Sequence, residues 1–144
     1  MTGSTTPYQR EREDVMTEQQ EIGRTILGEL MGEQYVKAKD ARRNAFNGVL
    51  QDYSEEVCFG RTWSRAGIDR KQRSILNIAM LTALNRPAQL AHHLEGAITN
   101  GCSMEEIREI LLHAAVYCGL PAAGEAFRVA EEVLRTKGLL PETN

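Results

Sequence analysis

Residues 69–101, DRKQRSILNIAMLTALNRPAQLAHHLEGAITNG, decide the fold of this chain. Apolar residues in the first half recur at steps of three and four, as one buried helix face requires. These residues are Ile75, Ile78, Ala79, Leu81 and Thr82. Asp69 and Gln72 fit a capping box at the start of this helix. The helix breaks at Asn85-Arg86-Pro87, because proline disfavours helical geometry in the residue before it and suits the start of a new helix. A second helix then runs to Asn100-Gly101, a common stop signal, so the stretch predicts a helical hairpin.

The rest of the chain also carries helical patterns. We expect helices within Pro7–Leu30, over Ala41–Thr62, from Ser103 to Gly119 and from Pro121 to Lys137. In the first of these helices the predicted packed face is Val15, Ile22, Ile26, Leu27 and Leu30. The predicted inward face of the second is Phe46, Val49, Leu50, Tyr53, Val57 and Phe59. No segment alternates with the period of two that a strand requires. We therefore predict an all-α fold, a single-domain bundle of about six to seven helices. It covers residues 7–144 and follows a polar tail, residues 1–6, that we expect to be disordered.

Composition and charge exclude several classes of function. Charged residues make up 26% of the 144 residues and hydrophobic residues 42%, which is ordinary for a globular domain that buries its own core. A net charge of −3 without a basic stripe argues against a nucleic-acid partner. No apolar run is long enough to span a bilayer, and residues 1–7 lack the pattern of a signal peptide. We therefore expect a cytoplasmic protein with no membrane partner.

The three cysteines do not form a recognisable redox or metal motif. Cys58, Cys102 and Cys118 contain no CxxC pair, and their number is odd. We expect them to be buried, reduced thiols.

Three segments resemble the carboxymuconolactone decarboxylase family. They are TWSRAGIDRKQRSILNIAMLTALNR (62–86), His93 with the turn at Asn100-Gly101, and SMEEIREILLHAAVYCGLPAAGEAFRVAEEVL (103–134). The resemblance implies a helical fold shared with alkyl hydroperoxidase D and assembly as a homo-oligomer, usually a trimer or hexamer. It also implies decarboxylation, without a cofactor, of 4-carboxymuconolactone. The product of this step of protocatechuate catabolism is the 3-oxoadipate enol-lactone.

The thiol-peroxidase branch of this superfamily does not fit the chain. That branch has the pattern Glu-x11-Cys-x2-Cys-x3-His. With His93 as the anchor, the two cysteine positions hold Arg86 and Gln89, and the glutamate position holds Ser74. Without a resolving pair there is no dithiol to turn over, so we reject this activity.

The decarboxylation has a sound chemical basis without a metal or organic cofactor. Loss of CO2 from 4-carboxymuconolactone pushes electrons through a conjugated alkene onto the lactone carbonyl. The protein must hold the second carboxylate, stabilise a dienolate oxygen and return a proton. The ordinary histidine pKa of about 6.5 suits proton return near neutrality.

The resemblance implies one catalytic and several binding residues. His93 is the candidate general acid or oxyanion donor, although a helical histidine is often a structural group. Arg65, Arg73 and Arg86 are candidates to hold carboxylates through their guanidinium forks, and the alternative for each is surface charge. The remaining candidates for substrate binding are Trp63, Tyr117 and His113. The alternatives are packing for Trp63, a core position for Tyr117 and a buried hydrogen bond for His113.

Glu95 departs from the family pattern, which usually has a basic residue at this position. A carboxylate close to the site would repel a small anionic lactone. Two alternatives therefore stay open beside the lactone decarboxylase. One is a relative that acts on another small carboxylated or carbonyl substrate, and the other is a non-catalytic oligomeric protein that binds a ligand.

Overall fold

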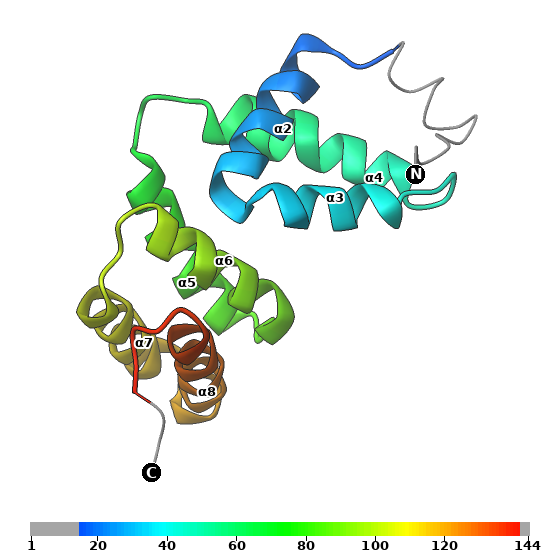
Figure 1. Ribbon diagram of the computed structural model, residues 1–144. Coiled ribbons are helices and arrows are strands. Elements are labelled where there is room, and N and C mark those ends of the chain that lie inside the picture. The colour runs from blue at the N-terminus through cyan, green and yellow to red at the C-terminus, as the bar shows by residue number, and fades with distance from the viewer. Residues whose placement is uncertain (1–14, 142–144) are drawn as a thin grey trace. The chain divides into compact units, whose positions relative to one another are not determined.

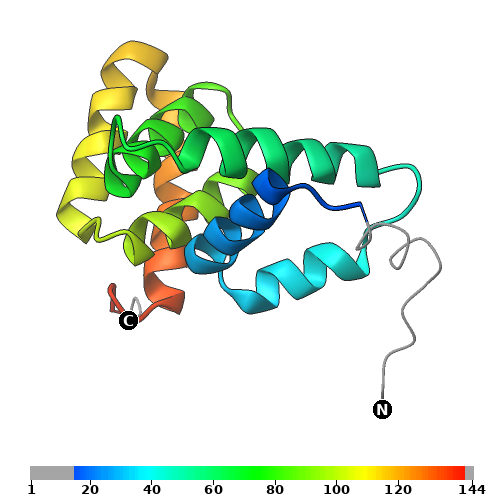
Figure 2. The same cartoon turned by 90° about the horizontal axis from the view of Figure 1, so that it is seen from above.

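The computed structural model describes residues 15–141, which fold into helices and short connectors (Figures 1 and 2). The elements are α2 (Glu18–Met31), α3 (Glu33–Ala41), α4 (Gly48–Tyr53), the π-helical segment η1 (Ser54–Trp63), α5 (Arg70–Ala83), α6 (Pro87–Thr99), α7 (Met104–Cys118) and α8 (Leu120–Thr136). The predicted all-α fold is confirmed. The predicted tail over residues 1–6 lies outside the described residues. Within residues 15–141, no helix combines the length and the apolar character needed to cross a bilayer.

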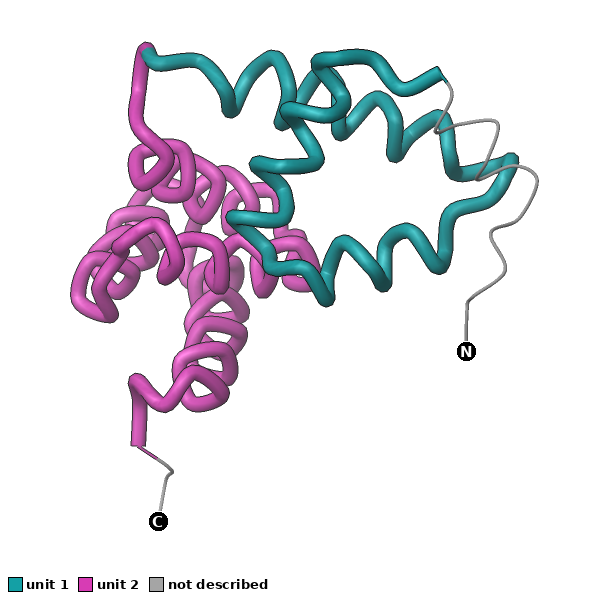
Figure 3. Tube along the Cα trace, turned by 45° about the horizontal axis from the view of Figure 1, so that its top comes forward, with its two compact units in different colours: residues 1–66 teal, residues 67–144 magenta. Residues whose placement is uncertain are grey.

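The chain divides into two compact units, each with its own core (Figure 3). Unit 1 is Met1–Ala66 and unit 2 is Gly67–Asn144. The single domain over residues 7–144 stays a prediction, and the two units are described separately below.

In unit 1, α2 packs against η1 at very short backbone distances. A Cβ atom added to Gly23 would lie 1.8 Å from the backbone oxygen of Glu55, and one added to Gly60 would lie 2.1 Å from the backbone oxygen of Gln19. Both positions therefore require glycine, because a side chain would collide with backbone that cannot move aside. The apolar core beside this contact consists of Ile26, Leu27, Leu30, Phe59 and Trp63.

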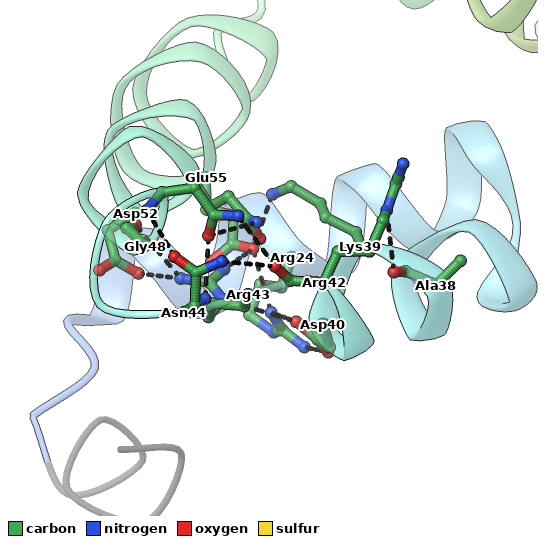
Figure 4. Close-up of polar contacts among 12 residues, drawn as sticks. Arg24, Ala38, Lys39, Asp40, Arg42, Arg43, Asn44, Gly48, Asp52 and Glu55 are labelled. Carbon is green, nitrogen blue, oxygen red and sulfur yellow. Dashed lines mark hydrogen bonds and ion pairs between the residues drawn. The ribbon is translucent and has the colours of Figure 1, made fainter.

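A buried cluster of charges joins α2, α3 and the helix formed by α4 and η1 (Figure 4). Its centre is Glu55, whose side chain has no exposed surface. One Glu55 oxygen, Oε1, accepts hydrogen bonds from Arg24 Nη1 at 3.0 Å, Lys39 Nζ at 2.9 Å and Arg43 Nη2 at 2.6 Å. Asp40 pairs with Arg24 at 2.6 Å, and Asp52 pairs with Arg43 at 2.5 Å. Three cations thus meet three carboxylates, which offsets the cost of taking each charge out of water.

The predicted helix over Ala41–Thr62 is wrong in its start and in most of its inward face. Helix formation begins at Gly48, after a turn in which Asn44 and Asn47 bond to nearby backbone. Four of the predicted inward residues are exposed, namely Phe46 (91%), Val49 (73%), Leu50 (69%) and Tyr53 (64%). The fully buried Glu55 lies on the inward side instead, together with Phe59, which was predicted correctly. An apolar pattern cannot indicate a face whose buried residues include a charge and a glycine.

The predicted first helix is partly confirmed. α2 begins at Glu18, where Thr17 and Gln20 form a capping box. Ile26, Leu27 and Leu30 are buried as expected. Val15 precedes the helix and is 76% exposed, so its predicted place on the buried face is wrong. The predicted start at Pro7 lies outside the described residues.

Unit 2 is a bundle of four helices in which α5 and α8 each pack against α6 and α7 (Figure 1). The predicted hairpin is confirmed by the capping box of Asp69 and Gln72 and by Pro87 in the first turn of α6. Asn85 has φ 51° and Gly101 has φ 92°, left-handed conformations that these two residue types tolerate. The core of the bundle includes Ile78, Leu90, Leu94, Ala97, Ile107, Leu111, Ala126, Val129 and Ala130.

The cysteine prediction is correct for one residue of three. Cys102 is a buried free thiol at the start of the turn before α7. Cys58 and Cys118 are also free thiols but are exposed. Cys118 is the last residue of α7 and Cys58 lies on the outer side of η1, so neither points into the core of its unit.

Candidate active site

The candidate site in unit 2 is built around a contact between α5 and α6. Asn77 of α5 places its side-chain nitrogen Nδ2 3.2 Å from Nδ1 of His93 on α6. Both side chains are half-buried, while their neighbours Ile78, Leu90 and Leu94 are completely buried. The helix period explains the placement, because the core residues anchor both helices and leave Asn77 and His93 at the border of the apolar contact.

A second amide sets the register of the same two helices. Asn100, which ends α6, donates from Nδ2 to the backbone oxygen of Arg70 at 3.3 Å and to Oγ of Ser74 at 3.0 Å. Ser74 is completely buried. The hairpin is therefore held by polar contacts at two separate levels along α5 and α6.

The surroundings of His93 keep its ring uncharged. Burial lowers the pKa of His93 to about 4, and the neighbouring His92 shifts it in the same direction. Burial has this effect because the charged imidazolium loses hydration when it leaves water. At neutral pH the ring is thus neutral, and the expectation of an ordinary pKa near 6.5 does not hold. A neutral imidazole suits hydrogen-bond donation to a developing oxyanion better than full proton transfer.

The three candidate arginines lie in different surroundings. Arg73 is half-buried on α5, one turn before Asn77 and on the same helix face. Arg86 is exposed at the N-cap of α6. Arg65 is exposed in unit 1, just after η1. Within unit 2, Arg73 is therefore the candidate that shares a helix face with the contact to His93.

The other candidates have packing or surface positions. Trp63 is buried in unit 1, where its ring lies 5.9 Å from that of Phe59. His113 and Tyr117 are exposed one turn apart on α7, with ring centroids 4.9 Å apart. The alternative assignment of His113 to a buried hydrogen bond is wrong, because its side of α7 faces away from the bundle core.

Glu95 lies on the side of α6 that faces α8. It forms an ion pair with Lys137 at 3.1 Å and lines a groove between the two helices together with Ala91 and Val133. His93 lies two residues earlier and contacts α5 instead. The objection that Glu95 would repel an anionic substrate is therefore weakened, because its charge is paired and directed toward another helix.

Asn77 was not singled out from the sequence. From the sequence, a polar residue between Leu76 and Ile78 in an apolar helix is interpreted as a surface position that tolerates polar side chains. The available signal was its spacing of four residues from Arg73, which places both side chains on one face. Among residues 15–141, no group of three or more His, Cys, Asp or Glu side chains is placed to hold a metal ion.

Known proteins with similar sequences include two decarboxylases. The sequence model described as "Carboxymuconolactone decarboxylase family" matches residues 49–132, which is more than half of the chain. The chain is 38% identical over 120 residues to 4-carboxymuconolactone decarboxylase of Acinetobacter baylyi, covering 83% of this chain and 90% of that protein. It is 40% identical over 114 residues to nitrosuccinic acid decarboxylase of Metarhizium robertsii, covering 78% of each. An uncharacterised 15.0 kDa protein of Paracoccus denitrificans is 36% identical over 81 residues, 54% of this chain and 60% of that protein. On these matches, the chain belongs to the carboxymuconolactone decarboxylase family.

Proposed function

We propose that the protein is a cofactor-independent carboxy-lyase that converts 4-carboxymuconolactone to the 3-oxoadipate enol-lactone. The observation that carries the proposal is the neutral, half-buried His93, held by Asn77 inside the segment that matches the decarboxylase family. The similarity to a 4-carboxymuconolactone decarboxylase over 83% of the chain supports this choice of substrate.

In the proposed reaction the substrate accepts its own electrons. The bond between the ring carbon and the leaving carboxylate breaks, CO2 departs, and the electron pair moves through the alkene to the lactone carbonyl oxygen. His93 donates a hydrogen bond to that oxygen while the negative charge develops. A proton from solvent then adds to the ring carbon next to the lactone carbonyl, and the ring double bond that remains at the former carboxylate-bearing carbon makes the product an enol-lactone. Arg73, one turn from Asn77, is the proposed partner of the carboxylate that remains on the substrate, because a guanidinium fork matches a carboxylate in geometry.

The first experiment follows the ultraviolet absorbance of the conjugated lactone, generated in place from 3-carboxymuconate by its cycloisomerase. We expect rapid loss of absorbance with one CO2 released per lactone and no added cofactor. Folded protein that leaves the absorbance unchanged would contradict the proposed substrate. In that case the family assignment would stand and the search would move to other carboxylates.

The role of His93 is tested by replacing it with alanine. We expect His93→Ala to lose about 100-fold in kcat, because one hydrogen-bond donor to the oxyanion is removed. His92→Ala is the matched control, since His92 is the exposed neighbour on the same helix. Circular dichroism checks that both variants remain folded. A rate of His93→Ala near that of the unmodified protein would show that His93 is not the donor.

A second candidate substrate class comes from the relative named for nitrosuccinic acid. A nitro group, like the conjugated lactone, can accept the electron pair that a departing carboxylate leaves behind. The shared requirement is a small dicarboxylate with an electron-withdrawing group next to the leaving carboxylate. Release of CO2 from nitrosuccinate but not from the lactone would favour this second candidate.

We also propose that the protein acts as a homo-oligomer, as the family resemblance implies. Four large apolar side chains are exposed in the single chain over α4 and the turn before it, namely Phe46, Val49, Leu50 and Tyr53. Apolar residues grouped in this way are typical of an interface between protein chains. Light scattering coupled to gel filtration should give the mass of a trimer or hexamer. The Leu50→Glu substitution should shift the oligomeric state toward the monomer. A monomer of the unmodified protein would refute this part of the proposal.

A further inference from the structure

The contact between Asn77 and His93 has a definite chemical direction. Nδ2 of an asparagine amide carries two hydrogens and no lone pair for accepting a hydrogen bond, so it can only donate. The atom that faces it at 3.2 Å is Nδ1 of His93, which must then accept with its lone pair. In a neutral imidazole only one nitrogen carries a proton, and here that nitrogen is Nε2.

We infer that Asn77 is a positioning residue that holds His93 in the Nε2–H tautomer, so that Nε2 presents a hydrogen-bond donor to the substrate. This inference rests on the proposed function for the role of the donor, but not for the tautomer itself. It adds a residue outside the set that the resemblance implied, and it explains why an amide lies between Leu76 and Ile78 on α5.

The same contact favours the neutral ring. A hydrogen bond accepted by Nδ1 is lost when Nδ1 is protonated, because two donors would then face each other. Burial acts in the same direction on the pKa of His93. The site thus combines a fixed tautomer with a ring that stays uncharged, which is the form required of a donor that does not give up its proton.

The tautomer can be measured directly in the unmodified protein. The protein is labelled with nitrogen-15 at histidine, and two-bond correlations between ring carbon-bound hydrogens and ring nitrogens are recorded near neutral pH. The three histidines are assigned with His92→Ala, His93→Ala and His113→Ala. We expect the His93 signals to show a pyrrole-type Nε2 and a pyridine-type Nδ1. The reverse pattern, with the proton on Nδ1, would overturn the inference whether or not the protein decarboxylates the lactone.

Asn77→Asp tests the cause, because an aspartate carboxylate accepts where the amide donates. We expect the proton to move to Nδ1 or the ring to become charged, and kcat to fall by about 100-fold with the substrate that the enzyme turns over. The matched control is Asn100→Asp, which makes the same change in another amide of this hairpin but leaves the contact to His93 intact. The control should keep the Nε2–H pattern.

The outcomes separate the inference from the proposed function. An Nε2–H signal in the unmodified protein that persists in folded Asn77→Asp would show that Asn77 does not set the tautomer. A tautomer that switches as expected in a protein that turns over no lactone would support the inference and contradict the proposed substrate. If Asn77→Asp does not fold, Asn77→Ala provides the comparison, and loss of a single Nε2–H pattern is expected there too.

Discussion

The two units of this protein bury polar groups in opposite ways. Unit 1 buries a full charge, Glu55, and surrounds it with cations on two other segments. Unit 2 half-buries a titratable group, His93, whose pKa is lowered to about 4 by burial, and places the amide of Asn77 against it. A buried charge that is paired with several cations serves to fix the structure, whereas a neutral imidazole at the border of a core is available for chemistry. The comparison places the structural polar cluster in unit 1 and the candidate catalytic group in unit 2.

The largest expected effect is on the glycine contact of unit 1. Gly23→Ala should lower the free energy of unfolding by about 4 kcal/mol or more, because its Cβ atom would meet the backbone oxygen of Glu55 at 1.8 Å. Gly28→Ala in the same helix is the control, since the nearest atom to its Cβ would be 4.0 Å away. The control should be neutral or gain up to about 1 kcal/mol from helix propensity. Urea unfolding measures both, and equal stability of the two variants would contradict the close packing.

The next effect tests the buried charge directly. Glu55→Gln should cost about 3 kcal/mol, because three cations would lose their common buried carboxylate. Glu56→Gln is the neighbouring control, in which the lost partner is the exposed Arg61, and it should cost less than about 1 kcal/mol. Thermal or urea unfolding measures the two variants. A Glu55→Gln protein as stable as the control would show that the cluster does not hold unit 1 together.

A third prediction uses the pH dependence of unit 2. The pKa of His93 is about 4 in the folded protein and about 6.5 in the unfolded chain, so between these values the unfolded chain binds a proton that the folded protein does not. Stability should therefore fall as the pH is lowered from 6.5 to 4, with about 2 kcal/mol due to this residue after allowance for its partial exposure. The His93→Asn variant should lose that part of the pH dependence, and His92→Asn should keep most of it. Urea unfolding at several pH values measures the difference, and identical curves for the unmodified and His93→Asn proteins would refute the assignment.

The smallest expected effect concerns Glu95. Its ion pair with Lys137 is well exposed on both sides, so Glu95→Gln should change the free energy of unfolding by about 0.5 kcal/mol or less. Turnover should change by less than about twofold, because a paired charge that faces α8 is screened from the site beside α5. Steady-state kinetics of the variant measure this. A large gain in kcat/KM would mean that Glu95 does act on the substrate, as its departure from the family pattern first suggested.

Local chemistry made the helices of unit 2 predictable. The capping box at Asp69 and the proline at the start of α6 depend on neighbours within a few residues, and both are confirmed. The predicted start of the next helix at Ser103 is confirmed too, where Ser103 and Glu106 form a capping box. The apolar period also indicated most of the buried residues there, because the core of this unit is built from aliphatic side chains.

The same reasoning failed in unit 1 for a physical reason. Its buried residues include Glu55 and Arg43, which an apolar period cannot detect. Their burial depends on partners 12 to 31 residues away in sequence, such as Arg24, whose proximity only folding creates. Phe46 is the opposite case, because it is an apolar residue that is exposed in the single chain.

The sequence by itself determined the all-α class, the hairpin of α5 and α6, the family and the candidate His93. These features depend on periodicity, caps and a motif, all of which are local. Only the tertiary structure decided that Asn77 faces His93, that Glu95 turns toward Lys137 and that Glu55 is buried among cations. Each of these depends on which side chains of separate helices meet, and on how much water that meeting removes. Desolvation and long-range pairing are therefore what give the candidate histidine a lowered pKa and a defined partner.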